Sequence, residues 1–196
     1  MAYQRKDSYY ARAKAVGYRS RAAFKLQELA RKYQLIRRGD RVVDLGAWPG
    51  GWLQVAAELV GPRGVVVGVD LQPIEPLGAA TITTLVGDAG EPAVQDELLA
   101  RCGGRVDVVL SDLAPKLSGV RDRDQARAAE LAETAVALAE RVLSPGGRLL
   151  VKVFTGADHG ALTGARRLFT TAKLTKPESS RRESSEMYLI GLDRRP

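Results

Sequence analysis

The chain has 196 residues, of which 45% are hydrophobic and 27% are charged, values that fit one ordinary globular domain and exclude a disordered or fibrous protein. Its single cysteine, Cys102, excludes an internal disulfide, and its single histidine, His159, argues against a zinc site with His and Cys ligands. No signal peptide or long apolar span is found, so we expect a soluble cytoplasmic protein in a reducing environment, without a membrane segment or a metal.

The positive charge is concentrated near the N-terminus. Residues 1–41 carry twelve Lys or Arg against three acidic residues, a net charge of +9, and the remaining 155 residues sum to −2. A second basic cluster consists of Arg166, Arg167, Lys173, Lys176, Arg181 and Arg182, interrupted by Glu178 and Glu183. Clustered Lys and Arg release phosphate counterions, so the two segments favour a polyanion-binding face; a solvated surface is the alternative.

We predict one domain over residues 1–196, with a basic helical segment at 1–40 and a core at 41–196. Within the segment, helical spacing begins after Ser20, the expected N-cap, and runs through Ala22, Leu26, Leu29, Ala30 and Tyr33. Four tyrosines interleaved with basic residues suit stacking on bases: Tyr3, Tyr9, Tyr10 and Tyr18. We expect at least one of these rings to anchor the segment to the core instead.

From residue 41 onward the chain alternates between strand and helix patterns. Buried strands are predicted at 41–45, 65–70, 81–86, 106–111 and 148–154. Helices are predicted at 52–60, at 91–102 and in a long stretch ending near 142, where SPGG terminates it. A further helix near 161–168, with His159 in a loop or at its start, precedes a weak strand at 173–176 and a final strand at 187–192.

This alternation predicts an α/β fold with a doubly wound, mostly parallel sheet of seven strands and right-handed crossovers. The short polar stretch between the last two strands leaves no room for a helical crossover, so we expect a hairpin and an antiparallel last strand. The beginning of that strand then lies at the edge formed by the carboxyl ends of the parallel strands. Open α/β sheets bind their ligands at this edge.

The stretch DLGAWPGGW, residues 44–52, predicts a nucleoside-containing cofactor. Its glycines let the backbone approach a ligand, and Asp70, 19 residues beyond Gly51 at the end of the second strand, is placed to accept ribose hydroxyls. A glycine turn made only for tight packing is the alternative.

The loop spacing and the C-terminal hairpin indicate which cofactor this is. Gly46, Gly50 and Gly51 do not form G-x-G-x-x-G, and Pro49 also fits a dinucleotide domain poorly. Together these features resemble the Rossmann-like fold of the methyltransferases that use S-adenosyl-L-methionine. Members of that fold contact the adenine where Asp88 falls, although an ordinary turn aspartate explains Asp88 equally well.

A lysine, Lys152, interrupts the apolar run LLVKVF of the fifth strand. An ammonium group there needs a partner or a cavity, because burying it alone costs several kcal/mol. Asp112 ends the fourth strand and Glu186 begins the last, so both should meet Lys152 at one edge, with Lys25 closing the group from the N-terminal helix. A buried Lys152–Asp112 ion pair with no further role is the alternative.

These four residues strongly resemble the Lys-Asp-Lys-Glu tetrad of the FtsJ/RrmJ family of RNA 2′-O-ribose methyltransferases. The segments YRSRAAFKL, VVDLGAWPGGW, VKVF and KPESSRRESSEMYLI resemble that family in order and spacing over nearly the whole chain. The resemblance implies catalytic roles for Lys25, Asp112, Lys152 and Glu186, with S-adenosyl-L-methionine as cofactor. It also implies cofactor contacts at Gly50, Trp52, Asp70, Asp88 and Asp112.

The substrate implied by the resemblance is RNA held by the basic segments. In length the chain is most similar to the bacterial members that act on the large ribosomal subunit, which methylate a uridine in the peptidyl-transferase A loop of 23S rRNA. Two residues depart from the family pattern: Trp48 replaces an alanine, and Lys116 replaces a common asparagine. Both affect specificity and affinity more than activity. We expect a monomer, since no large apolar surface stripe remains.

A 2′-hydroxyl is a poor nucleophile, so the enzyme must align it with the methyl group and help it lose its proton. Burial and a neighbouring cation such as Lys25 favour neutral Lys152, whereas Asp112 and Glu186 favour its charged form. Both a base and an orienting donor remain open for Lys152. Three other functions remain as alternatives: a tRNA 2′-O-methyltransferase, a non-catalytic RNA-binding factor in ribosome assembly and a dinucleotide-dependent oxidoreductase.

Overall fold

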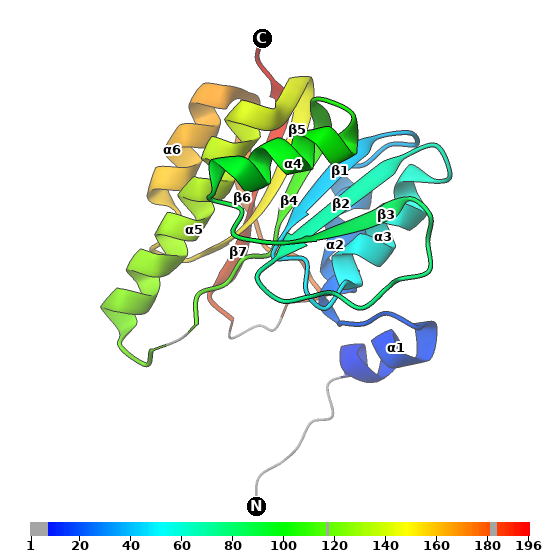
Figure 1. Cartoon of the computed structure of the whole chain (residues 1–196). Helices are drawn as coiled ribbons and strands as arrows, with labels where there is room; N and C mark the ends of the chain where they lie inside the picture. The colour runs from blue at the N-terminus through cyan, green and yellow to red at the C-terminus, as the bar shows by residue number, and fades with distance from the viewer. Residues whose placement is uncertain (1–7, 117, 181–183) are drawn as a thin grey trace, which may run out of the picture.

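The computed structural model describes residues 8–116, 118–180 and 184–196 and forms one seven-stranded sheet with helices on both faces (Figure 1). The strand order is β3-β2-β1-β4-β5-β7-β6. The strands are β1 (Arg41–Leu45), β2 (Val65–Asp70), β3 (Ile82–Val86), β4 (Val106–Ser111), β5 (Leu143–Phe154), β6 (Phe169–Thr175) and β7 (Glu186–Arg194). This confirms the predicted α/β methyltransferase-type sheet.

The direction of the last strand is also confirmed. The first five strands run parallel, whereas β7 pairs antiparallel with both β5 and β6. The register of β5 with β7 sets Lys152 opposite Tyr188 and Phe154 opposite Glu186. Glu186, at the start of β7, therefore lies at the carboxyl end of β5.

Helices cover the sheet in two layers (Figure 1). One face is covered by α2 (Ala22–Tyr33) and α3 (Gly51–Val60), and the other by α4 (Pro92–Cys102), α5 (Arg121–Val142) and α6 (His159–Leu168). Neighbouring residues of one strand pack on opposite faces of the sheet: Val42 packs with α2 and α3, and Val43 packs with α4 and α5. Burial on both faces explains why the strands read as continuous apolar runs.

The N-terminal segment differs from the prediction in two respects. An additional helix, α1 (Ser8–Val16), precedes α2. Its sequence SYYARAKAV mixes small apolar, aromatic and basic residues without a marked apolar stripe, and Ala13 is its one buried side chain among residues 11–16. The N-cap prediction is wrong, because Arg21 occupies that position and no side chain caps the helix. Ser20 instead packs its hydroxyl against Gly51, which leaves no space for a Cβ there.

Two strand boundaries also differ. β5 begins at Leu143, directly after α5, because Leu143 pairs with Val106 before an irregularity shifts the register. β6 begins at Phe169, directly after α6, and the Phe169 ring is buried in the core, whereas the rest of the strand is exposed or half-buried. His159 begins α6, one of the two predicted positions. No helix in the described ranges is long and apolar enough to cross a membrane.

Candidate active site

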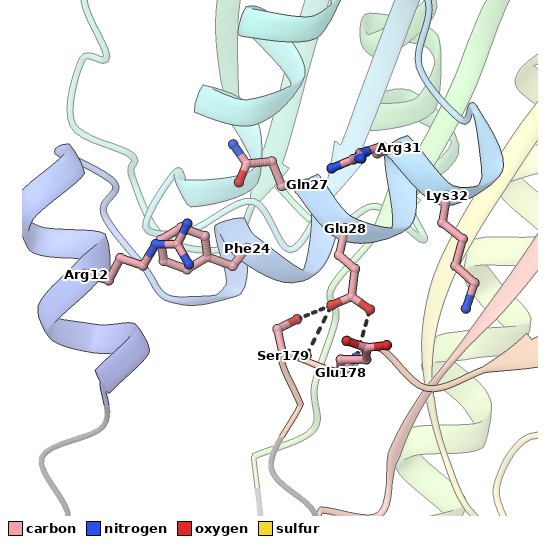
Figure 2. A pocket seen from close by; sticks show the side chains of 8 residues that line it. All are labelled: Arg12, Phe24, Gln27, Glu28, Arg31, Lys32, Glu178 and Ser179. Carbon is pink, nitrogen blue, oxygen red and sulfur yellow. Dashed lines mark hydrogen bonds between the residues drawn. The ribbon is translucent and has the colours of Figure 1, made fainter.

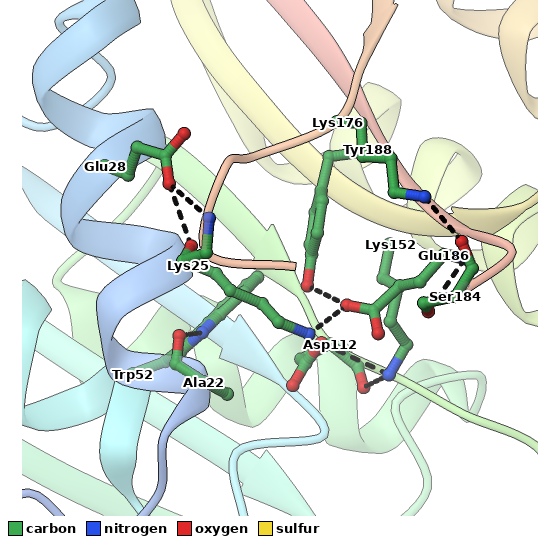
Figure 3. A network of polar contacts seen from close by, with 11 residues as sticks. Ala22, Lys25, Glu28, Trp52, Asp112, Lys152, Lys176, Ser184, Glu186 and Tyr188 are labelled. Carbon is green, nitrogen blue, oxygen red and sulfur yellow. Dashed lines mark hydrogen bonds and ion pairs between the residues drawn. The ribbon is translucent and has the colours of Figure 1, made fainter. Parts of the chain in front are cut away.

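The four residues predicted to converge lie in one polar network at the carboxyl edge of the sheet (Figure 3). Asp112 directly follows β4, Lys152 lies near the end of β5, and Glu186 begins β7. Lys25 comes from α2, which packs over this part of the sheet. We refer to these four residues, Lys25, Asp112, Lys152 and Glu186, as the tetrad.

Lys152 explains the interruption of the apolar strand. Its ammonium Nζ donates to the backbone carbonyl of Asp112 at 2.6 Å and lies 3.2 Å from Asp112 Oδ1. The Lys152 side chain is only 9% exposed, so these contacts offset the loss of hydration. Burial raises the pKa of Asp112, while the positive charges of Lys152 and Lys25 lower it and leave a net upward shift.

The second half of the tetrad is a close ion pair between Lys25 Nζ and Glu186 Oε1. Tyr188 donates its hydroxyl to the same oxygen at 2.6 Å. Burial alone raises the pKa of Glu186, but the hydrogen bonds from Lys25 and Tyr188 and the charges of Lys25 and Lys152 outweigh it, so the net pKa shift is downward. Glu186 is therefore held as a carboxylate.

Tyr188 belongs to this network although the sequence did not indicate it. Its side chain is fully buried, with the ring centroid 5.9 Å from Lys25 Nζ and 6.0 Å from the Trp52 ring. Burial, together with the negative charges of Asp112 and Glu186, raises the pKa of Tyr188 well above its ordinary range. The phenol therefore stays protonated and acts as a donor to Glu186. Its position two residues after Glu186 on one strand was the available signal.

The glycine loop after β1 lies at the same edge. Gly46 and Gly50 have φ angles of 74° and 110°, which other residues rarely adopt. A Cβ on Gly46 would also stand 3.0 Å from a methyl carbon of Leu113. Trp52, at the start of α3, buries its ring and donates its indole N–H to Ala22 O at 2.8 Å. The side chain of Trp52 thus joins α3 to α2, and the contact of Trp52 with a cofactor stays a prediction.

The two other predicted cofactor residues follow the neighbouring strands. Asp70, at the end of β2, accepts the backbone N–H groups of Trp48 and Gln72, each at 2.9 Å. Asp88, after β3, accepts the N–H of Gly90 at 2.8 Å. Both carboxylates shape their own turns at the ligand edge, and each oxygen keeps a further lone pair for a ligand.

Asp44, within β1, is a second residue that sequence reasoning missed. Its side chain is fully buried, and neither carboxylate oxygen has a hydrogen-bond partner among the described residues. Burial and the negative charges of Asp112 and Asp70 raise the pKa of Asp44 well above its ordinary range. An orphaned carboxyl group is costly, so it indicates a site for a cation or a hydrogen-bond donor.

Arg19, in the link between α1 and α2, joins the loops that flank this edge. Its guanidinium donates to Pro49 O at 3.2 Å, to Glu75 O at 2.7 Å and to Pro76 O at 2.7 Å. Pro49 belongs to the glycine loop, and the other two carbonyls belong to the stretch after β2. One side chain thus connects the basic N-terminal segment to both loops.

Of the four tyrosines singled out in the sequence, Tyr18 is the one whose side chain the structure describes. Tyr18 donates its hydroxyl to Glu58 Oε2 at 2.7 Å and packs edge-on against Phe24, so it anchors the segment to α3 and α2. Burial and the Glu58 hydrogen bond raise the pKa of Tyr18 to about 12. Tyr3 and the side chains of Tyr9 and Tyr10 lie outside the described part of the chain, as do Arg181, Arg182 and Glu183 of the second basic cluster.

Sequence comparisons place these residues in context. A family model described as FtsJ-like methyltransferase matches residues 18–194. The chain is 48% identical over 193 residues to ribosomal RNA large subunit methyltransferase E of Methanothermobacter thermautotrophicus, and the match covers 98% of this chain and 92% of that protein. It is 45% identical to the protein of the same name from Syntrophobacter fumaroxidans, with 98% of both chains covered.

Solved structures show the same architecture. A chain from Plasmodium falciparum, named as a ribosomal RNA methyltransferase, superposes with a TM-score of 0.77 at 28% identity and covers 90% of this chain and 98% of that one. Fibrillarin from Aeropyrum pernix, solved with S-adenosyl-L-methionine bound, superposes with a TM-score of 0.57 at 16% identity over 81% of this chain and 68% of that one. The second likeness concerns the fold alone.

Proposed function

Since the chain belongs to the FtsJ-like methyltransferase family, we propose that it transfers the methyl group of S-adenosyl-L-methionine to the 2′-hydroxyl of a ribose in RNA. The observation that carries this proposal is the tetrad, buried at the sheet edge with two ammonium and two carboxylate groups in contact. A ribose hydroxyl placed among these groups meets both donors and acceptors at one point.

The residues beside the tetrad fit the cofactor. S-adenosyl-L-methionine carries an ammonium group at its amino-acid end, and the orphaned carboxyl group of Asp44 is a buried acceptor in need of such a donor. Gly50 and the backbone of Trp52 would approach the ligand closely, while Asp70 and Asp88 would accept from its ribose and adenine. The cofactor supplies a methyl group already activated on a sulfonium, so the protein need not activate the electrophile.

The tetrad then handles the hydroxyl. We assign Lys152 to the 2′-oxygen, where its deprotonated amine orients the hydroxyl, accepts the proton as the methyl group is transferred, and so becomes the ammonium that Asp112 holds. Asp112 positions Lys152 through the two contacts described above. Lys25 and Glu186, held together and supported by Tyr188, place the ribose. The protein must also hold the oxygen, the methyl carbon and the sulfur nearly in line, because such positioning contributes strongly to the rate.

A groove along α2, the helix that carries Lys25, suits the RNA chain (Figure 2); we call it the basic groove because three basic residues outnumber two acidic ones in its lining. It has a volume of about 490 Å³ and is lined by Arg12, Phe24, Gln27, Glu28, Arg31, Lys32, Glu178 and Ser179. The Arg12 guanidinium lies 4.8 Å over the Phe24 ring. Glu28 accepts the backbone N–H groups of Glu178 at 2.8 Å and Ser179 at 3.1 Å, so α2 holds the far wall of the groove. Phosphates would pair with its Arg and Lys side chains.

Ribosomal RNA of the large subunit is the proposed substrate, with a uridine of the 23S A loop as the target. The names of relatives at 45–48% identity over nearly the full chain support large-subunit rRNA as the substrate, and the uridine target rests on the family resemblance of the sequence. We further propose that segment 1–40 and the core at 41–196 act as one methyltransferase domain, as a monomer in the cytoplasm.

Transfer of labelled methyl groups tests the proposal. Unmethylated large subunits, free rRNA and tRNA are incubated with labelled S-adenosyl-L-methionine, and the product is mapped by resistance of the 2′-O-methylated linkage to alkaline cleavage. We expect label at one 2′-oxygen of large-subunit rRNA with the wild type and none with Lys152→Ala. Label on tRNA alone would replace the rRNA assignment. A wild type that binds the cofactor and labels no RNA would refute the activity.

A further inference from the structure

A second cavity lies beyond the carboxyl end of β5, and the proposed mechanism does not use it. Its volume is about 600 Å³. It is enclosed by the loop after β4, the first turns of α5, the end of β5 and the residues before β7. The lining consists of Pro115, Arg121, Asp124, Gln125, Ala128, Phe154, Thr155, Ser184 and Ser185.

Phe154 connects this cavity to the tetrad. Lys152 and Phe154 are two residues apart on β5, so their side chains share one face of the strand. The Phe154 ring centroid lies 5.9 Å from Lys152 Nζ, and Phe154 is paired in register with Glu186. The cavity therefore begins beside the atoms that we assign to the ribose.

The cavity and the predicted cofactor residues lie on opposite sides of the tetrad. The glycine loop and Asp70 follow β1 and β2, on one side of β4 in the sheet order. Phe154 and Thr155 follow β5, on the other side of β4. A ribose at Lys152 thus has the methyl donor on one side and this cavity on the other.

The lining offers both a ring surface and free polar groups. Phe154 is half-buried. Arg121 and Gln125, four residues apart on α5, both reach the cavity, and neither side chain has a hydrogen-bond partner in the described ranges. Asp124 is occupied, because it accepts from Ser118 and Gly119 and so fixes the loop at the rim.

We propose that this cavity holds the nucleobase of the methylated nucleotide, with the base stacked on Phe154 and its polar edge bonded to Gln125. This inference rests on the proposed function. The base and the 2′-hydroxyl are attached to adjacent ribose carbons, so a hydroxyl at Lys152 brings the base to the nearest open space. Enzymes that recognise unpaired RNA stack splayed bases on aromatic rings and read their edges with polar side chains. Arg121, exposed at the mouth, pairs with the neighbouring phosphate.

A matched pair of substrates isolates the contact with the base. The RNA that the wild type methylates is rebuilt by ligation with either the natural base or an abasic ribose at the target position, so that both keep the 2′-hydroxyl. The enzymes compared are the wild type, Phe154→Leu, which keeps apolar volume and loses the ring, and Gln125→Ala. Arg123→Ala is the control, because Arg123 is exposed on α5 and does not line the cavity.

On the natural RNA we expect Phe154→Leu to lower kcat/KM by between about 5-fold and about 100-fold, the range for loss of one stacked base. The abasic RNA should cost the wild type a similar factor. Phe154→Leu and Gln125→Ala should then lose little more on the abasic RNA, since the contact is already absent. Arg123→Ala should match the wild type on both RNAs.

Two results would overturn the base pocket. One is full activity of both variants on the natural RNA. The other is an equal loss on the natural and abasic RNAs, which would mean that the variants act through the tetrad or the fold. Either result leaves the proposed function intact, provided that the wild type methylates the natural RNA. Absence of label with the wild type on every RNA is a separate outcome, which refutes the methyltransferase activity itself.

Discussion

Lys152 and Tyr188 are directly opposed in the antiparallel pairing of β5 and β7, and each contacts a different carboxylate of the tetrad. Lys152 contacts Asp112, and Tyr188 donates to Glu186. Backbone pairing of β5 with β7 fixes Lys152, Glu186 and Tyr188 relative to one another, and Asp112, directly after β4, is held by the hydrogen bond from its N–H to Leu45 O at 3.0 Å. The tetrad therefore stands on rigid elements, as accurate positioning of reacting groups requires.

Substitution of Lys152 tests its assignment as the group that takes the proton. We expect Lys152→Arg to lose methyl transfer as completely as Lys152→Ala, because a guanidinium stays protonated and cannot accept a proton. Single-turnover rates with saturating cofactor and RNA measure this. Both variants should bind the cofactor normally, since Lys152 lies on β5, on the side of β4 away from β1 and its glycine loop. Substantial activity in Lys152→Arg would identify Lys152 as an orienting donor.

Removal of the Tyr188 hydroxyl tests the support of Glu186. We expect Tyr188→Phe to lower the free energy of unfolding by about 1.5–3 kcal/mol, the usual contribution of a hydrogen bond to a charged group. It should also slow methyl transfer about tenfold, because Glu186 is less well placed. Tyr33→Phe is the matched control: it removes the bond from Tyr33 to Thr175 Oγ1 at 3.0 Å, away from the tetrad. A slow Tyr33→Phe would show that the rate reports stability alone.

Asp44 should make the protein without cofactor less stable as the pH rises. The pKa of Asp44 is raised in the folded state, so from roughly pH 4 upward the unfolded chain ionises first and binds fewer protons. We expect Asp44→Asn to be more stable than the wild type by about 1–3 kcal/mol at pH 7.5, with the difference vanishing near pH 4. Urea unfolding at the two pH values measures this.

The same substitution should weaken cofactor binding. Asp44→Asn removes the carboxyl group that we propose pairs with the ammonium group of S-adenosyl-L-methionine, so affinity measured by calorimetry should fall at least about tenfold. A variant that is more stable but binds the cofactor with unchanged affinity would assign Asp44 to the fold alone.

The basic groove should contribute affinity that depends on salt. We expect Arg12→Ala and Arg31→Ala each to weaken RNA binding at low salt and to reduce the slope of log K against log salt by about 0.7 per lost phosphate contact on single strands. Arg63→Ala is the control, because Arg63 is exposed between α3 and β2, outside both basic segments. Slopes equal to that of the wild type would exclude phosphate contacts in this groove.

Much of the fold was predictable because the residues that become buried form recognisable apolar patterns in the sequence. Val42 and Val43 enter different core layers, and such runs predict parallel strands covered on both faces. The helix α1 was not predicted, since its apolar residues form no marked stripe and Ala13 is the one buried side chain among residues 11–16. β6 was longer than predicted, because it lies at the sheet edge and Phe169 alone of its residues is fully buried, so the strand shows no apolar pattern.

The candidate site was predictable where a charged residue lies within an otherwise apolar stretch. Lys152 within LLVKVF is such a residue, and the topology then indicates Asp112 and Glu186 as its neighbours. Tyr188 and Asp44 gave no comparable signal. A tyrosine is ordinary in a strand, and an aspartate before a glycine turn is ordinary as well. Their importance depends on complete burial and on what lies opposite them, which follows from tertiary packing alone.

The register of β7 also determines which changes in chain length the protein can tolerate. Side chains alternate along a strand, so one residue inserted between Glu186 and Tyr188 would send one of them to the opposite face of the sheet. The tetrad would then lose either the partner of Lys25 or the donor that supports it, although every original residue remained in the sequence. An insertion after Arg194, beyond the pairing with β5, would leave both in place. Natural variation in length is therefore expected outside this strand.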